Sequence, residues 1–162
     1  MELKRKILDL IEHDSHISSK TIATMLDEDE DNIRALIKEM EADKTIIGYN
    51  TIINWDKVGC DLVTAMIDVK VVPEREVGFN AIAERIYRFP EVRCVYLMSG
   101  TYDLSVVVEG TNMKDVARFV SFKLSTLDHV QSTTTHFILK RYKQDQFILE
   151  DPDEDKRLVV SP

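Results

Sequence analysis

Arg34 and Lys38 are four residues apart in a stretch with helical periodicity, so both cations lie on one polar side of the predicted helix. Cations placed in this way, with the amide of Asn32 just ahead of them, can bind phosphate oxygens and base edges in a DNA groove. Three polar residues at the start of the preceding helix can add phosphate contacts. The predicted contacts to double-stranded DNA are Ser18, Lys20, Thr21, Asn32, Arg34 and Lys38.

Other reactive side chains have no telling arrangement. None of the four histidines stands at a catalytic spacing from a nucleophile or carboxylate, and the two cysteines lack metal-ligand or redox spacing. These residues are His13, His16, His129, His136, Cys60 and Cys94. No phosphate-binding loop is present either. The sequence therefore predicts no metal site, no cofactor and no enzymatic activity.

The charge distribution conflicts with DNA binding. The chain has a net charge of −8, and residues 1–60 hold 8 Lys and Arg against 13 Asp and Glu. Five consecutive acids, residues 27–31, stand immediately before and within the predicted DNA-contacting helix. Such acids weaken nonspecific binding wherever they lie near phosphate. The alternative interpretation of this region is a three-helix module that binds another protein.

Three short helices are expected in the first fifty residues. The first spans about three turns and stops near residues 13–15, and the second runs from Ser19 to Leu26 with Ser18 as its N-cap. Asp29 is placed to cap the third helix, where carboxylates favour the positive end of the helix dipole. A compact three-helix unit with a tight turn before its last helix is a helix-turn-helix, which inserts that helix into the major groove.

Residues 45–53 are rich in β-branched side chains and predict a bent strand or a strand-turn-strand. The following segment, residues 54–59, reads as a hinge. We therefore expect a helix-turn-helix domain at 1–50 and a linker strand and hinge at 51–60. A second domain at 61–143 and an acidic tail at 144–162 complete the predicted organisation.

The second domain has the pattern of alternating strands and helices. A strand is expected from Leu62 to Val72, a helix opened by Pro73 and ended by Pro90, and strands from Val92 to Met98 and from Tyr102 to Glu109. Asn112 begins a second helix, and a last strand runs from Val130 to about Tyr142. The order βαββαβ is that of the ferredoxin-like fold, so the fold class is α+β: three helices followed by a ferredoxin-like domain.

Two helices cover only one face of such a sheet. The last strand carries threonines and apolar residues on both faces, which suits packing of the second face against another sheet. We therefore expect an obligate homodimer, with larger rings possible.

The residues resemble the Lrp/AsnC family of transcriptional regulators over about residues 3–143. The resemblance rests on the apolar pattern of the first domain, Ile46-Ile47-Gly48-Tyr49, Gly59, the loop Ser99-Gly100-Thr101-Tyr102-Asp103-Leu104, and Val130 to Thr135. Family membership implies a homodimer, often built into an octamer, that binds DNA and responds to an amino acid or related metabolite. It also implies that the loop lies at the effector pocket.

In that pocket, loop amides and hydroxyls can hold a carboxylate, and Asp103 can accept from an α-ammonium group. The effector-binding residues implied by the resemblance are Gly100, Thr101, Tyr102, Asp103, Thr133 and Thr135. The family usually has Gly-Leu-Ser where this chain has Asp27-Glu28-Asp29, and a glycine where it has Lys44. These departures keep an alternative open: a protein of the same fold that binds the effector and assembles, with weak or lost DNA binding.

No apolar run approaches the roughly 18 residues of a membrane span, and the chain starts in helical periodicity without a signal-peptide core. We therefore expect a cytoplasmic protein that does not bind a membrane.

Overall fold

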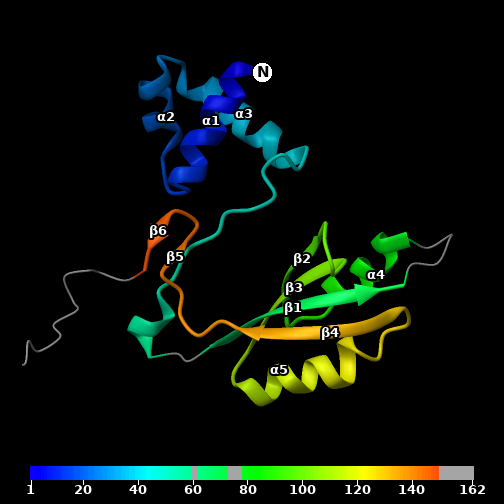
Figure 1. Cartoon of the computed structure of the whole chain (residues 1–162). Coiled ribbons are helices and arrows are strands. Elements are labelled where there is room, and N and C mark those ends of the chain that lie inside the picture. Colours follow the sequence, from blue (N-terminus) through cyan, green and yellow to red (C-terminus); the bar gives the residue numbers. More distant parts are fainter. Residues whose placement is uncertain (60–61, 73–77, 150–162) are drawn as a thin grey trace, which may run out of the picture. The chain divides into compact units, whose positions relative to one another are not determined.

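The computed structural model describes residues 1–59, 62–72 and 78–149 of the 162-residue chain. It divides into two units, Met1–Ile52 and Ile53–Pro162, which we describe separately (Figure 1). Cys60, the predicted helix start at Pro73 and the tail from residue 150 lie outside the described residues. The domain limits given above stay predictions.

The N-terminal unit consists of α1 (Glu2–His13), α2 (Ser19–Leu26) and α3 (Glu30–Ala42). Both predicted N-caps are confirmed: the Ser18 hydroxyl accepts a hydrogen bond from the Thr21 amide, and the Asp29 carboxylate accepts from the amides of Asp31 and Asn32. The apolar stripes of the helices meet in a small core. It is formed by Ile7, Ile22, Ala23, Ile33, Met40 and Ile46.

Two residues of this unit adopt the left-handed backbone conformation. Asp27 ends α2 with φ 55° and ψ 48°, and Lys44 follows α3 with φ 65°. Both are positions where the sequence departs from glycine of the resembled family. The backbone thus keeps a conformation that glycine adopts most easily, without glycine being there.

The strand expected at residues 45–53 is wrong. Ile46 is buried in the helical core and its amide donates to the carbonyl of Met40, which closes the end of α3. Residues 47–54 have no regular structure, and a short 3₁₀ turn, η1 (Trp55–Val58), follows. β-branched residues form a strand only where a partner strand is available, and no partner for this segment is present among the described residues.

The C-terminal unit confirms the ferredoxin-like prediction. Its elements are β1 (Val63–Val71), α4 (Gly78–Tyr87), β2 (Val92–Leu97), β3 (Leu104–Gly110), α5 (Met113–Phe119) and β4 (Val130–Phe137). The strands form an antiparallel sheet in the order β2-β3-β1-β4. In the central register Ile67 pairs with Val106 on one side and with Thr135 on the other.

The last strand is shorter than expected. β4 ends at Phe137, and a two-stranded hairpin of β5 (Lys143–Gln144) and β6 (Phe147–Ile148) follows, across the predicted boundary between the second domain and the tail. The last residue pair with β1 is Ala65 with Phe137, and one further backbone hydrogen bond joins the Ile138 amide to the Thr64 carbonyl. Since β1 begins at Val63, the alternation from Leu139 onward has no partner on that strand.

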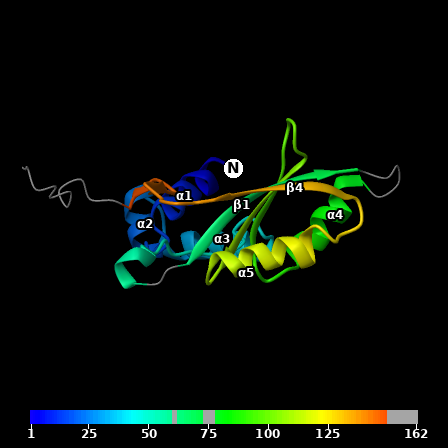
Figure 2. The ribbon, with the colours of Figure 1, turned by 60° about the horizontal axis from the view of Figure 1, so that its bottom comes forward.

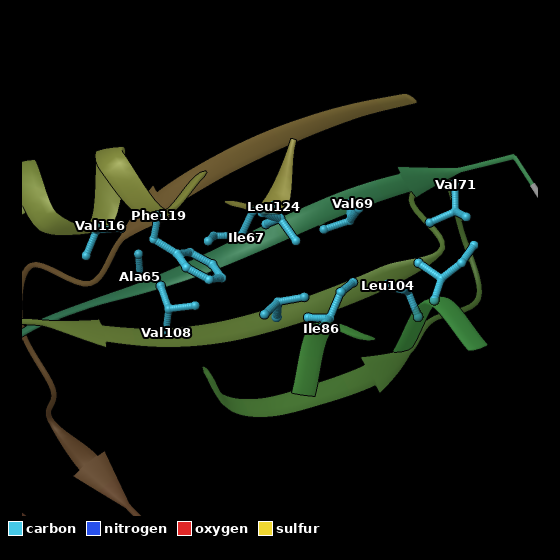
Figure 3. Packing of buried hydrophobic residues seen from close by; sticks show 12 residues of the cluster. Ala65, Ile67, Val69, Val71, Ile86, Leu104, Val108, Val116, Phe119 and Leu124 are labelled. Carbon is cyan, nitrogen blue, oxygen red and sulfur yellow. The ribbon is translucent and has the colours of Figure 1, made fainter. Parts of the chain in front are cut away.

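Both helices cover the same face of the sheet, and a turn of π-helix, η2 (Val120–Leu124), continues α5 (Figure 2). Side chains from this face and from the helices form the core, with Ile67 and Val69 of β1 under Ile86, Phe119 and Leu124 (Figure 3). The opposite face carries the alternate residues of each strand, among them Met66 of β1 and Tyr96 of β2. We call it the open sheet face.

Candidate functional site

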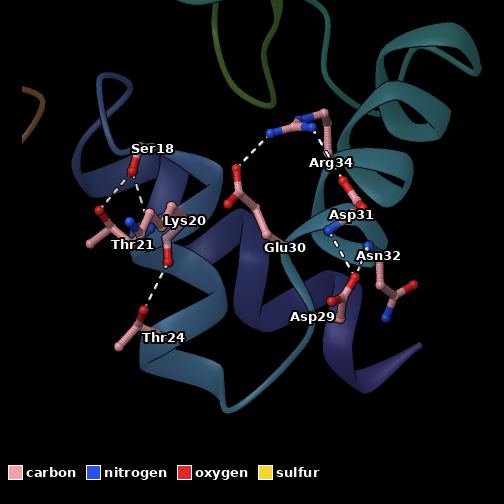
Figure 4. A network of polar contacts seen from close by, with 9 residues as sticks. All are labelled: Ser18, Lys20, Thr21, Thr24, Asp29, Glu30, Asp31, Asn32 and Arg34. Atoms are coloured by element: carbon pink, nitrogen blue, oxygen red, sulfur yellow. Dashed lines mark hydrogen bonds and ion pairs between the residues drawn. The ribbon is translucent and has the colours of Figure 1, made fainter.

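The first candidate site consists of polar residues of α2 and of α3 in the N-terminal unit (Figure 4). Ser18 and Thr21 share a hydrogen bond between their hydroxyls at 2.7 Å, and the Thr24 hydroxyl donates to the carbonyl of Lys20 at 3.0 Å. The predicted phosphate contacts Ser18, Lys20 and Thr21 are therefore neighbours on an exposed helix start. Backbone N–H groups at a helix N-terminus point outward and favour anions.

On α3 the predicted base-contacting cation is paired with acids of its own helix. The Arg34 guanidinium lies 2.5 Å from the Glu30 carboxylate and 3.3 Å from that of Asp31 (Figure 4). The side-chain amide of Asn32 donates to Glu28 at 3.4 Å. Lys38 is exposed, with no ion pair among the described residues.

These ion pairs leave Arg34 able to bind DNA. An exposed ion pair at i,i+4 contributes only about 0.3–0.5 kcal/mol, so a phosphate or a guanine can displace the carboxylate at small cost. The acids do lower the local positive potential. The helix thus has the polar side chains that a groove-binding helix needs, together with carboxylates that repel the DNA phosphates.

The second candidate site is the turn between β2 and β3, which projects from the sheet (Figure 2). Asp103 anchors this turn: its carboxylate accepts from the Val71 amide at 2.9 Å and forms an ion pair with the Lys70 ammonium at 3.1 Å. The Val71 hydrogen bond and the neighbouring Lys70 charge hold the pKa of the Asp103 carboxyl below its usual value. Asp103 thus stays ionised and fixes the turn against the end of β1.

The remaining residues of the turn differ in exposure. Gly100 has φ 148° and, like Thr101, is exposed, so their backbone and hydroxyl groups are accessible. Tyr102 is half-buried, and its hydroxyl lies 2.7 Å from that of Thr134 on β4. This contact spans β1 and links the turn to the far edge of the sheet.

The predicted Thr133 and Thr135 are not the threonines beside Tyr102. They pair with Val69 and Ile67 of β1, so they face the helices, whereas Thr134 faces the open side. Sequence reasoning missed Thr134 and Lys70. The sequence shows which residues of a strand alternate onto the same face. Without the pairing register between strands, it does not show which of the two faces lies beside the turn.

None of the helices in the described segments is long and apolar enough to cross a membrane. In the same part of the chain, no group of three or more His, Cys, Asp or Glu side chains is placed to hold a metal ion.

Comparison with known proteins agrees with both units. The family model of the Lrp/AsnC ligand-binding domain matches residues 64–148. YugG of Bacillus subtilis, an uncharacterised HTH-type transcriptional regulator, is 56% identical over 162 residues, which covers 99% of this chain and 98% of that protein.

Solved structures share the fold at lower identity. The crystal structure of MtbAldR has a TM-score of 0.76 at 22% identity, over 89% of this chain and 97% of that one. The regulator NMB0573 of Neisseria meningitidis, in complex with L-Met, has a TM-score of 0.71 at 19% identity, over 89% and 92%.

The helix-turn-helix unit and the ligand-binding unit together define a class, the helix-turn-helix transcriptional regulators with an effector domain. Within that class, the chain belongs to the Lrp/AsnC family.

Proposed function

We propose that this regulator binds promoter DNA as a homodimer or a higher oligomer, and that an amino acid or a related small molecule alters that binding. DNA binding is supported by the exposed polar side of α3, which carries Arg34 and Lys38 on a helix capped at Asp29. Its N-terminal residues enter the major groove, while Ser18, Lys20 and Thr21 contact phosphate. We place this activity in the cytoplasm, together with the DNA.

DNA binding is tested by gel shift with the DNA upstream of the protein's own gene, at low and moderate salt. The double variant Arg34→Gln/Lys38→Gln should lose specific binding, and its salt dependence should be shallower by about one unit of slope per lost phosphate contact. Arg85→Gln, which removes a cation from α4 of the other unit, is the control and should bind like wild type.

The effector half is supported by the chemistry of the β2–β3 turn. Exposed amides at Gly100 and Thr101, the Thr101 hydroxyl and the nearby Lys70 ammonium can hold a carboxylate, and Asp103 retains lone pairs for an ammonium donor. The neighbour that binds L-Met has the same fold. An amino acid is therefore the ligand class proposed here.

A thermal-shift screen of the amino acids, followed by gel shift with each hit, tests this half. Asp103→Asn is the sharper variant, because an asparagine oxygen can still accept from the Val71 amide while the charge is lost. A hit whose effect is unchanged in Asp103→Asn and in Thr101→Val would remove the turn from the effector site.

A second candidate function is favoured by the acids before and within the first turn of α3. Glu28, Glu30 and Asp31 surround the polar residues that would read DNA, so the protein can be an effector-binding and assembly protein with little DNA binding. An amino-acid-dependent thermal shift without any specific gel shift at low salt would select this alternative.

The oligomer is proposed from the open sheet face. Met66 lies on the central strand β1 and is 43% exposed, and Tyr96 lies on the edge strand β2 and is 51% exposed. Both are large apolar side chains of a sheet face that the helices do not cover. Packing this face against the same face of a second copy would bury them.

A further inference from the structure

A cavity at the other end of β3 has no role in the function proposed above. The β2–β3 turn precedes Leu104, whereas the cavity is lined by residues 108–111 at the opposite end of the strand. Its volume is about 490 Å³, within the range of small-molecule sites in proteins. Glu91, α5 and η2 supply the other walls.

The floor of the cavity is apolar. Val108 of β3 lies beneath Val116 and Phe119 of α5 (Figure 3). Phe122 adds an exposed aromatic wall. Phe122 belongs to the π-helical turn η2, in which the Ser125 amide bonds to the carbonyl of Val120. Single π turns inside a helix occur frequently at functional positions. An apolar body of four or five carbons would fit against these side chains.

Three of the five charged residues that line the cavity form ion pairs among the described residues. Lys123 pairs with Glu91 and lies 5.6 Å from the Phe89 ring, and Glu109 pairs with Arg93. Asp115 accepts hydrogen bonds from Thr111 and Asn112. Asp115 and Arg118 are the two charged lining residues without an ion pair within the described part of the chain, and Arg118 is the cation of the two. Its guanidinium is suited to a carboxylate.

A hydrogen-bond donor is missing at the Glu91 wall. One carboxylate oxygen of Glu91 contacts Lys123, while the other, Oε2, is buried without a partner among the described residues. The Lys123 hydrogen bond lowers the pKa of Glu91, so the carboxylate is ionised. Buried carboxylate oxygens are nearly always hydrogen-bonded, so this wall of the cavity lacks one donor.

We propose that this cavity is a second small-molecule site, which binds an apolar 2-amino or 2-hydroxy acid. The carboxylate of the ligand pairs with Arg118, its amino or hydroxyl group donates to Glu91, and its apolar side chain lies on Val108, Val116, Phe119 and Phe122. The site is independent of the β2–β3 turn.

Methyl NMR of the full-length protein labelled at valine tests the proposal. Leucine and 2-hydroxy-4-methylpentanoate should each shift the Val108 and Val116 methyl signals in a saturable way, and the stronger of the two identifies the donor. 4-Methylpentanoate, which lacks the donor, should bind several-fold more weakly. Leucinamide, which lacks the carboxylate, should bind about tenfold more weakly or not at all.

Variants assign the contacts. Arg118→Gln should weaken binding about tenfold, and Phe122→Ala, at a side chain that is 74% exposed, several-fold without unfolding the protein. Lys114→Gln removes a cation from the same helix outside the cavity and should leave binding unchanged. Asp103→Asn should also leave these shifts unchanged. Equal binding by Arg118→Gln, or no saturable shift of the Val108 and Val116 methyl signals, would each overturn the proposal.

Discussion

Asp103 is the residue that holds the β2–β3 turn in place. Its carboxylate satisfies the amide of Val71, a buried residue at the end of β1, and pairs with Lys70 on the same strand. Since an unsatisfied buried amide costs about 1–3 kcal/mol, the contact between Asp103 and Val71 is structural whatever ligand the turn binds.

We predict that Asp103→Ala lowers the free energy of unfolding by about 2 kcal/mol at neutral pH, because it orphans the Val71 amide and leaves Lys70 unpaired. Urea denaturation monitored by circular dichroism measures the change. Asp103→Asn should lose less than half as much. Equal losses in the two variants would show that charge, not the hydrogen bond to Val71, dominates.

The same residue gives a pH dependence. The pKa of Asp103 is lower in the folded protein than in the unfolded chain, so its contribution is complete above the unfolded value of about 3.9. It is lost as the pH falls through the lower folded value. The stability difference between wild type and Asp103→Ala should therefore be constant from pH 7 to about 5 and shrink below about 4. A difference that instead shrinks as the pH rises would contradict this sign.

Arg34 is the residue on which the acidic surroundings act most directly. Replacing its two partners, in Glu30→Gln/Asp31→Asn, should raise DNA affinity roughly tenfold at low salt and less at moderate salt, because the acids oppose phosphate through a screened potential. Fluorescence anisotropy with labelled DNA measures this. Asp9→Asn/Glu12→Gln on α1 removes the same charge elsewhere, and an equal gain there would assign the effect to net charge alone.

At the scale of elements, α3 is defined by the residues at its ends. Asp29 caps its start, and the left-handed residues Asp27 and Lys44 turn the chain before and after it. The sequence departs from the family at all three positions. The structure gives a physical reason why the departures are tolerated: Asp29 performs the capping of a serine, and the two other residues adopt the backbone conformation of glycine at a modest energetic cost.

We predict that Lys44→Gly stabilises the N-terminal unit by up to about 1 kcal/mol, and Asp27→Gly by less, because aspartate tolerates the left-handed conformation better than lysine. The gain is smaller than the strain relieved, since glycine also raises the entropy of the unfolded chain. Thermal denaturation of both variants measures the order. Lys44→Ala removes the lysine side chain but keeps the strained left-handed backbone conformation, so this variant should show no gain in stability.

The elements were predictable where the signal is short-range. Ser18, Asp29 and Asn112 cap their helices as their positions predicted, since a cap depends on three or four consecutive residues. Strand limits depend on a distant partner strand. The predictions of a strand after Lys44 and of a last strand continuing beyond Phe137 were therefore wrong. The same limit applied to the site: Thr134 could be told from Thr133 only once β1 and β4 had a register.

At the scale of the whole molecule, we propose that the open sheet face is the surface through which the protein assembles. We predict that Met66→Glu, on the central strand β1, shifts the oligomer toward monomer, because a carboxylate would be buried between two sheets. Light scattering after size-exclusion chromatography measures the mass. Tyr87→Glu on α4, at a side chain that is 57% exposed, should not change it. A wild-type monomer would contradict the proposed dimer.

Residues 47–54 join the two units through a segment without regular structure. In a dimer assembled by the C-terminal units, this short covalent connection keeps the second helix-turn-helix unit near the DNA once the first has bound. The second binding step is then intramolecular, at an effective concentration in the millimolar range for a short linker. An acidic helix-turn-helix unit that binds a single half-site weakly can therefore bind an operator with two half-sites tightly as part of a dimer. The same dimer dissociates quickly from isolated half-sites elsewhere on the chromosome.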